Sequence, residues 1–184
     1  MRSLAVAIAI ACSVAAPGVA QEGAAPQRAP DVIFVPTPPD VVDAMLKLAR
    51  VTSSDVVYDL GSGDGRIPIA AAKTYGARGV GIDIDPERVR EATANARSNG
   101  VADKVTFLNE DLFTANISPA TVVTLYLSGP VNARLAGKLM RDLKPGTRIV
   151  SHAFDLGDWK PLQTVTVSGR PIYFWTVPQP SQRR

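Results

Sequence analysis

The chain has 184 residues, of which 46% are hydrophobic and 20% charged, a composition that suits one globular domain and leaves too little length for two. These values exclude an intrinsically disordered, collagen-like or coiled-coil protein. Basic residues exceed acidic ones by only 20 to 17, and no basic run is longer than two residues, so the chain lacks the signature of a nucleic-acid-binding surface.

Residues 1–20 have the pattern of a secretory signal peptide. Arg2 gives the segment a positive start, a short apolar stretch follows at 4–11, and small residues end it at 18–20. The apolar stretch is shorter than the roughly 20 residues that cross a bilayer. We therefore expect residues 1–20 to be removed, and the mature protein to be exported, periplasmic or secreted, with no membrane span.

Two alternatives remain for this segment: a retained N-terminal helix and a lipid anchor on Cys12. Cys12 is the only cysteine in the chain, and the residues before it lack the leucine that lipid-attachment sites usually carry, which argues against the anchor. Cleavage after Ala20 would leave a mature protein without cysteine. Disulfides and thiol chemistry would then be excluded.

The next segment, 21–39, is rich in proline and poor in large apolar residues, so we expect an extended arm. From residue 40 the apolar pattern alternates between helical and strand spacing. A helix capped by Asp40 is predicted first, followed by a buried strand at 56–58 and a glycine-rich turn. A second helix is predicted over 67–75 and a second strand over 79–82.

Asp85 is expected to cap a third helix that runs to residue 98. The remaining predicted elements are strands at 105–108, 122–127 and 148–152, a helix over 131–143, and a hairpin of strands 165–167 and 172–177. This order predicts one α/β domain over 40–184, with a doubly wound, Rossmann-like seven-stranded sheet, mostly parallel, and an antiparallel C-terminal hairpin.

The turn after the first predicted strand has the spacing G-x-G-x-G at Gly61, Gly63 and Gly65, with Asp59 before it and Asp64 within it. Glycines let a ligand lie against the main chain without meeting a Cβ atom. A dinucleotide site has the spacing G-x-G-x-x-G, and two carboxylates would repel its pyrophosphate. The same carboxylates attract an ammonium and a sulfonium, which favours S-adenosylmethionine (SAM).

Two further acidic residues follow the next two predicted strands. Asp83 ends the second strand, where a carboxylate can accept both hydrogen bonds of a ribose diol. Asp111 follows the third strand and could accept from the exocyclic amine of adenine, with Leu112 or Phe113 packed on the ring. Open α/β sheets bind their ligands at this carboxyl edge, so the three acidic positions together predict a nucleoside site.

These motifs, DLGSGDGR, GIDID and EDLF, resemble those of the class I, seven-stranded SAM-dependent methyltransferases. Within that class the chain resembles the small single-domain family that includes mitochondrial protein lysine methyltransferases and bacterial relatives. The resemblance extends over roughly residues 37–177 and implies that the cofactor contacts include Asp59, Gly61, Ser62, Gly63, Asp83 and Asp111. It implies a methyltransferase that acts on a nitrogen, such as that of a protein lysine, or on an oxygen nucleophile.

Tyr126 and His152 are the candidate catalytic residues. Tyr126 lies at the end of the fourth predicted strand, in a loop without the Asn/Asp-Pro-Pro-aromatic motif of the enzymes that methylate adenine or glutamine. Alternatively, Tyr126 is only a half-buried strand residue. His152, the only histidine, ends the fifth strand and could act as a general base or be purely structural. No histidine or cysteine cluster is present, so no metal site with such ligands is expected.

Three other functions stay open. The chain could be a small-molecule methyltransferase of the same fold, or a SAM- or nucleoside-binding protein without catalysis. A nicotinamide-dependent reductase is the most distant alternative, because the glycine spacing disfavours it. We expect a protein or small-molecule methyl acceptor as the partner, and no nucleic acid.

Overall fold

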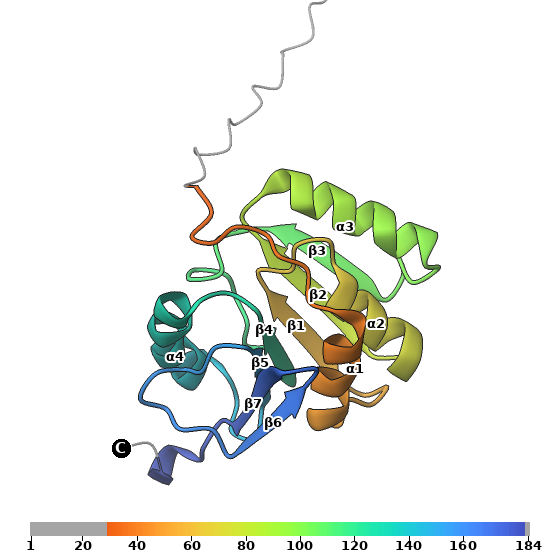
Figure 1. The fold of residues 1–184 in the computed structure, drawn as a ribbon. Helices are drawn as coiled ribbons and strands as arrows, with labels where there is room; N and C mark the ends of the chain where they lie inside the picture. Colours follow the sequence, from red (N-terminus) through yellow and green to blue (C-terminus); the bar gives the residue numbers. More distant parts are fainter. Residues whose placement is uncertain (1–28, 183–184) are drawn as a thin grey trace, which may run out of the picture.

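A computed structural model describes residues 29–182 and shows one twisted sheet between two layers of helices (Figure 1). The helices are α1 (Pro39–Leu48), α2 (Arg66–Tyr75), α3 (Pro86–Ser98), α4 (Gly129–Asp142) and the short 3-10 helix η1 (Pro180–Gln182). The strands are β1 (Val56–Leu60), β2 (Arg78–Asp83), β3 (Val105–Asn109), β4 (Val122–Leu125), β5 (Arg148–His152), β6 (Gln163–Val167) and β7 (Arg170–Thr176).

The seven strands lie in the order β3-β2-β1-β4-β5-β7-β6. The first five are parallel, and β7 runs antiparallel to both β5 and β6. The predicted fold class is therefore confirmed, including the antiparallel hairpin at the C-terminal end. The strand order reverses between β1 and β4, where open α/β sheets place their ligands.

Each face of the sheet has its own core. On one face the strand residues Tyr58, Val123 and Ile149 pack with the buried leucines of α4. On the other face the neighbouring residues Val57 and Val122 pack with α1 and α2. Both faces of β4 are covered, which explains its continuous apolar sequence.

The first helix and the fourth strand differ from the sequence prediction. Asp40 is not the cap of α1, because the helix starts after Pro38 and has no side-chain cap. Asp40 instead accepts a hydrogen bond from Ser168 Oγ, at 2.5 Å. The strand predicted over 122–127 stops at Leu125, and Tyr126 leaves the sheet. Asp85 caps α3 as predicted, accepting from the Glu87 N–H at 2.8 Å.

Residues 29–38 form no helix or strand and lie across the carboxyl ends of β1 and β2 before entering α1 (Figure 1). The predicted signal segment, 1–20, lies outside the described residues. Within residues 29–182, no helix has the length and hydrophobicity needed to span a membrane.

Candidate functional site

The turn between β1 and α2 lies at the carboxyl edge of the sheet. Gly61, Gly63 and Gly65 have φ values of 80°, 51° and 79°, in the left-handed region that favours glycine. The N–H groups of Gly61 and Ser62 donate to the Ile82 carbonyl, at 2.8 and 3.0 Å. The predicted glycine turn is thus held against the end of β2.

Asp83 links this turn to the start of α3. Its Oδ2 accepts from the Gly63 N–H at 2.8 Å, and its Oδ1 accepts from the Asp85 N–H at 3.0 Å. A carboxylate oxygen can accept a second hydrogen bond. The two backbone contacts therefore fix the carboxylate and leave it able to accept from the hydroxyl groups of a ligand.

Asp59 is the most perturbed carboxyl group of the site. It is 3% exposed and accepts a hydrogen bond from Thr124 Oγ1, at 2.6 Å. Burial raises its pKa to about 7, the Thr124 hydrogen bond opposes this, and the charges of Asp83 and Asp64 add to it. Asp59 is therefore partly protonated near neutral pH, and a cation placed beside it would favour its ionised form.

Asp111 and Asp64 have local partners. Asp111 Oδ1 accepts from the Phe113 N–H at 2.9 Å, which fixes the loop after β3. Asp64 forms an ion pair with Arg66, at 2.6 Å. This pairing leaves the Asp64 charge largely neutralised within the protein.

A cavity of about 870 Å³, its open mouth included, lies above these groups. Five of the six predicted cofactor residues line it, namely Asp59, Gly61, Ser62, Asp83 and Asp111, and so does the candidate Tyr126. Gly63 is covered by the Phe34 ring, which a Cβ atom at this position would approach to 2.2 Å. Six of the lining residues are aspartates and only two are arginines. The cavity thus suits a cationic ligand.

The N-terminal arm forms the outer side of the cavity, a position not predicted from its sequence. Residues 30–37 all line it. The arm is held to α4 by the Asp31–Arg134 ion pair, at 3.7 Å, and to α2 by Arg66, which donates to the Thr37 carbonyl at 2.8 Å. The only hint in the sequence is the apolar run 32–35 within a proline-rich segment.

The candidate catalytic residues lie together but differ in access to the cavity. Tyr126 lines it, whereas His152 does not and is only 1% exposed. Their ring centroids are 3.9 Å apart. Burial lowers the pKa of His152, and the positive charge of Arg170 lowers it further, so the imidazole is neutral near pH 7. The structure thus places His152 against Tyr126 rather than in the cavity.

Comparison with known proteins agrees with this geometry. Residues 59–163 match the family model described as the ANTKMT methyltransferase domain. A protein-lysine N-methyltransferase of Saccharolobus islandicus is 48% identical over 75% of this chain and 86% of its own length. The adenine nucleotide translocase lysine N-methyltransferase of the mouse is 33% identical over 67% of this chain, which spans only 54% of that protein.

A solved structure is also similar. It is a crystal structure described as an RNA methyltransferase from Salinibacter ruber in complex with S-adenosyl-L-homocysteine. It is 59% identical in sequence, has a TM-score of 0.78, and covers 79% of this chain and 95% of its own.

Proposed function

The chain belongs to the ANTKMT methyltransferase domain family and is a SAM-dependent methyltransferase, and we propose that its methyl acceptor is the amine of a protein lysine. The observation that carries this proposal is the charge of the cavity, whose lining has an excess of acidic side chains even with Asp64 paired to Arg66 and Asp31 paired to Arg134. Both SAM and a lysine side chain approach as cations, and this surface attracts both.

We propose the following placement of the cofactor. Its amino-acid end lies over the glycine turn near Asp59, its ribose hydroxyls donate to Asp83, and its adenine lies near Asp111. Ser62 lines the cavity, but its Oγ is buried against Gly81 of β2, so we assign its contact with the cofactor to the backbone. Side chains in place of the turn glycines would collide with Leu127, Phe34 and Phe107, so the glycines are required by the packing around the turn.

Bound SAM supplies a methyl group that is already activated by its positive sulfur. The protein must therefore hold a neutral amine in line with that group and exclude water. Leu127 and Val131 give the cavity apolar sides, and the N-terminal arm covers it. The lysine ammonium must also lose its proton to water or to a carboxylate before attack, and its removal from bulk solvent favours that loss.

The acidic cavity argues against an RNA acceptor, although the similar Salinibacter structure is described as an RNA methyltransferase. Phosphate groups bind to surfaces rich in Lys and Arg. The cavity has no lining lysine, and one of its two arginines, Arg66, is paired with Asp64. A protein cation fits this site better than a polyanion.

Methyl transfer to different acceptor classes tests the proposal. The purified protein is incubated with radiolabelled SAM and one acceptor at a time. The acceptors are lysine peptides, the same peptides carrying arginine instead of lysine, free amines and RNA. We expect label on the lysine peptides, located on Nζ by mass spectrometry. Label on RNA or on free amines alone would contradict a protein lysine acceptor, and no transfer to any acceptor in a cell extract would indicate a binding protein.

We also propose that residues 1–20 direct export, since they combine a positive start, a short apolar stretch and small residues before Gln21. Fusion of residues 1–30 to alkaline phosphatase, which is active only outside the cytoplasm, tests this. Substitution of the apolar stretch by serines provides the control. An inactive fusion that accumulates in the cytoplasm would contradict export.

A further inference from the structure

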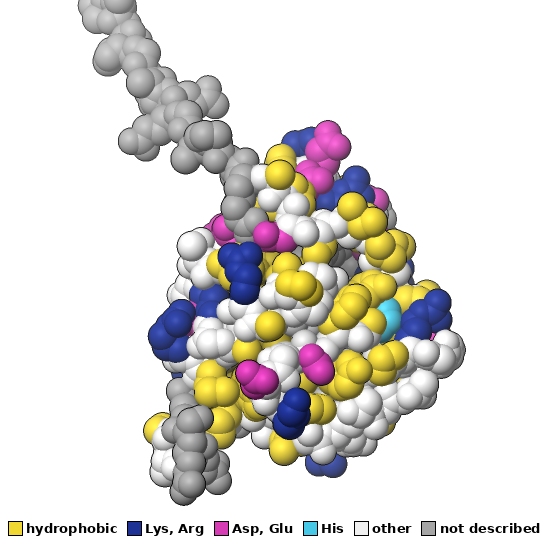
Figure 2. Space-filling view, turned by 60° about the vertical axis from the view of Figure 1, so that its left-hand side comes forward, with side chains coloured by type: hydrophobic (Ala, Val, Ile, Leu, Met, Phe, Trp, Pro, Cys, Tyr) yellow, Lys and Arg dark blue, Asp and Glu magenta, His cyan; other side chains and the backbone are white. Residues whose placement is uncertain are grey.

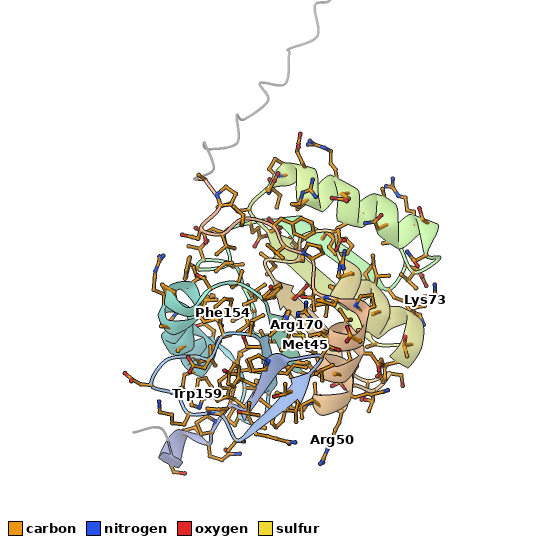
Figure 3. All side chains as sticks on the ribbon, in the orientation of Figure 1. Met45, Arg50, Lys73, Phe154, Trp159 and Arg170 are labelled. Carbon is orange, nitrogen blue, oxygen red and sulfur yellow. The ribbon has the colours of Figure 1, made fainter. Side chains whose placement is uncertain are left out.

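An aromatic surface leads from the cofactor cavity to the outside of the molecule. Tyr126 lines the cavity, and the Phe154 ring lies nearly parallel to the Tyr126 ring, with centroids 6.5 Å apart and planes 19° apart. Phe154 is 37% exposed and lies beside α4 (Figure 3). With the α4 side turned toward the viewer, hydrophobic side chains gather around the one histidine of the chain, shown in cyan (Figure 2).

Buried polar groups hold Phe154 at this place. Asn132 in α4 is fully buried and donates through Nδ2 to the Phe154 carbonyl and to Ser151 Oγ, each at 3.0 Å. Ser151 Oγ donates to the same carbonyl at 2.6 Å. Ala153, which directly precedes Phe154, has a φ of +66°, which is unfavourable for a residue other than glycine.

Core packing does not explain this arrangement, because it turns a large apolar ring toward solvent. Strained backbone fixed by buried hydrogen bonds is a feature found at functional sites. Tyr126 is supported from behind by the His152 ring. Since that imidazole is buried and neutral near pH 7, it adds no positive charge that would repel an incoming amine.

We propose that Tyr126 and Phe154 form one wall of the channel by which the acceptor lysine reaches the methyl donor, and that Phe154 determines specificity for this long aliphatic amine. The methylene chain of lysine packs on aromatic rings, and its ammonium is attracted to their faces until the proton is lost. Asn132 and Ser151 act as positioning residues through the Phe154 backbone. This inference rests on the proposed lysine acceptor and adds the surface that recognises it.

Two adenosyl ligands test the wall without knowledge of the natural acceptor. Both are nitrogen analogues of SAM: the reference ligand carries the methyl group on that nitrogen, and the other carries a four-carbon aminoalkyl chain in its place. Calorimetry gives the affinity of each, and their ratio measures the contribution of the chain. We expect the wild-type protein to bind the chain-bearing ligand more tightly.

Phe154→Ala should lower this ratio roughly fivefold and leave the affinity for the methyl-bearing reference ligand unchanged, since one ring–cation contact is removed. Phe154→Tyr should retain the ratio. Leu162→Ala is the matched control, because Leu162 is apolar, 68% exposed and, like Phe154, outside the cavity lining, but has no ring to stack on Tyr126. Its ratio should equal that of the wild-type protein.

The outcomes separate the inference from the proposed function. A wild-type protein that gains nothing from the aminoalkyl chain would count against the lysine acceptor itself. A wild-type gain that Phe154→Ala retains would overturn the inference alone. Equal weakening of both ligands by Phe154→Ala would also overturn it, because Phe154 would then belong to the cofactor site.

Discussion

The buried carboxyl group of Asp59 makes cofactor binding depend on pH. Burial raises its pKa to about 7, so protonation stabilises the folded protein, and this contribution is lost as pH rises from 3.8 through 7. A cation bound beside Asp59 favours the ionised carboxylate instead. SAM binding should therefore release a proton, and its affinity should rise by up to tenfold per pH unit below 7 and level off above.

Calorimetry in buffers of different ionisation enthalpy measures the released protons. Asp59→Asn keeps an oxygen that can accept from Thr124 and removes the titrating group, so the variant should bind SAM with little dependence on pH between 6 and 8. If wild-type affinity is constant over this range, the cofactor cation does not lie beside Asp59.

Asp83→Ala should weaken SAM binding by about 1–3 kcal/mol, because it removes a charged hydrogen-bond acceptor and the group that fixes the Gly63 N–H. Titration calorimetry with the purified variants measures this. Asp103→Ala provides the control, since Asp103 is exposed and lies outside the cavity lining. An unchanged affinity of Asp83→Ala would remove Asp83 from the cofactor site.

We expect the N-terminal arm to retain the cofactor while contributing little to the free energy of unfolding. Ile33, Phe34 and Val35 are 86%, 43% and 49% exposed, so their removal uncovers little of the core. Deletion of residues 1–35 should weaken SAM binding roughly tenfold and leave the midpoint of urea unfolding nearly unchanged. Phe34→Ala should give part of this effect, and equal affinity of the full and shortened chains would contradict it.

Asp55, at the end of the sheet opposite the cavity, holds the central strands together through its hydrogen bonds. Asp55 is 4% exposed and binds Arg148, the Thr121 hydroxyl at 2.7 Å and the Thr52 N–H at 2.8 Å. Burial alone would raise the pKa of Asp55, but these partners outweigh it and lower the pKa. Its contribution to stability is therefore present above pH 3.8 and is lost as pH falls through the lowered value.

Asp55→Asn should lower the free energy of unfolding by about 3 kcal/mol, because it leaves the partly buried Arg148 unpaired. Urea unfolding at pH 7 measures this loss. Asp43→Asn is the matched control, since the Asp43–Lys47 pair is exposed and should contribute less than about 1 kcal/mol. Equal losses for the two variants would contradict a structural role for the Asp55 cluster.

The elements and the carboxyl-edge site were predictable because local patterns encode them. Glycine spacing gives the turn at 61–65, and acidic residues mark the strand ends at Asp83 and Asp111. Contacts between distant residues were not predictable. Asp40 pairs with Ser168, 128 positions away, instead of capping its own helix. The arm over the cavity was missed for the same reason, since its sequence carries no helical or strand period.

At the scale of the whole molecule, ligand binding should appear as thermal stability. A ligand that binds only the folded state at 100 times its dissociation constant adds about 2.7 kcal/mol. For a domain of this size, S-adenosyl-L-homocysteine should then raise the Tm by roughly 5–10 °C. NAD should not, because the turn lacks the G-x-G-x-x-G spacing. A Tm raised by NAD and unaffected by S-adenosyl-L-homocysteine would contradict the assignment of the site.

The arm also connects residue 29 to the cover of the cavity with no helix or strand in between. Because residue 29 continues directly into the segment over the cavity, a pull on that end acts on the cover before it acts on the sheet. Tension there would shorten the residence time of the methyl donor, and slack would lengthen it. We therefore expect tethering or trimming of the arm at residue 29 to change turnover through the release of the methyl donor.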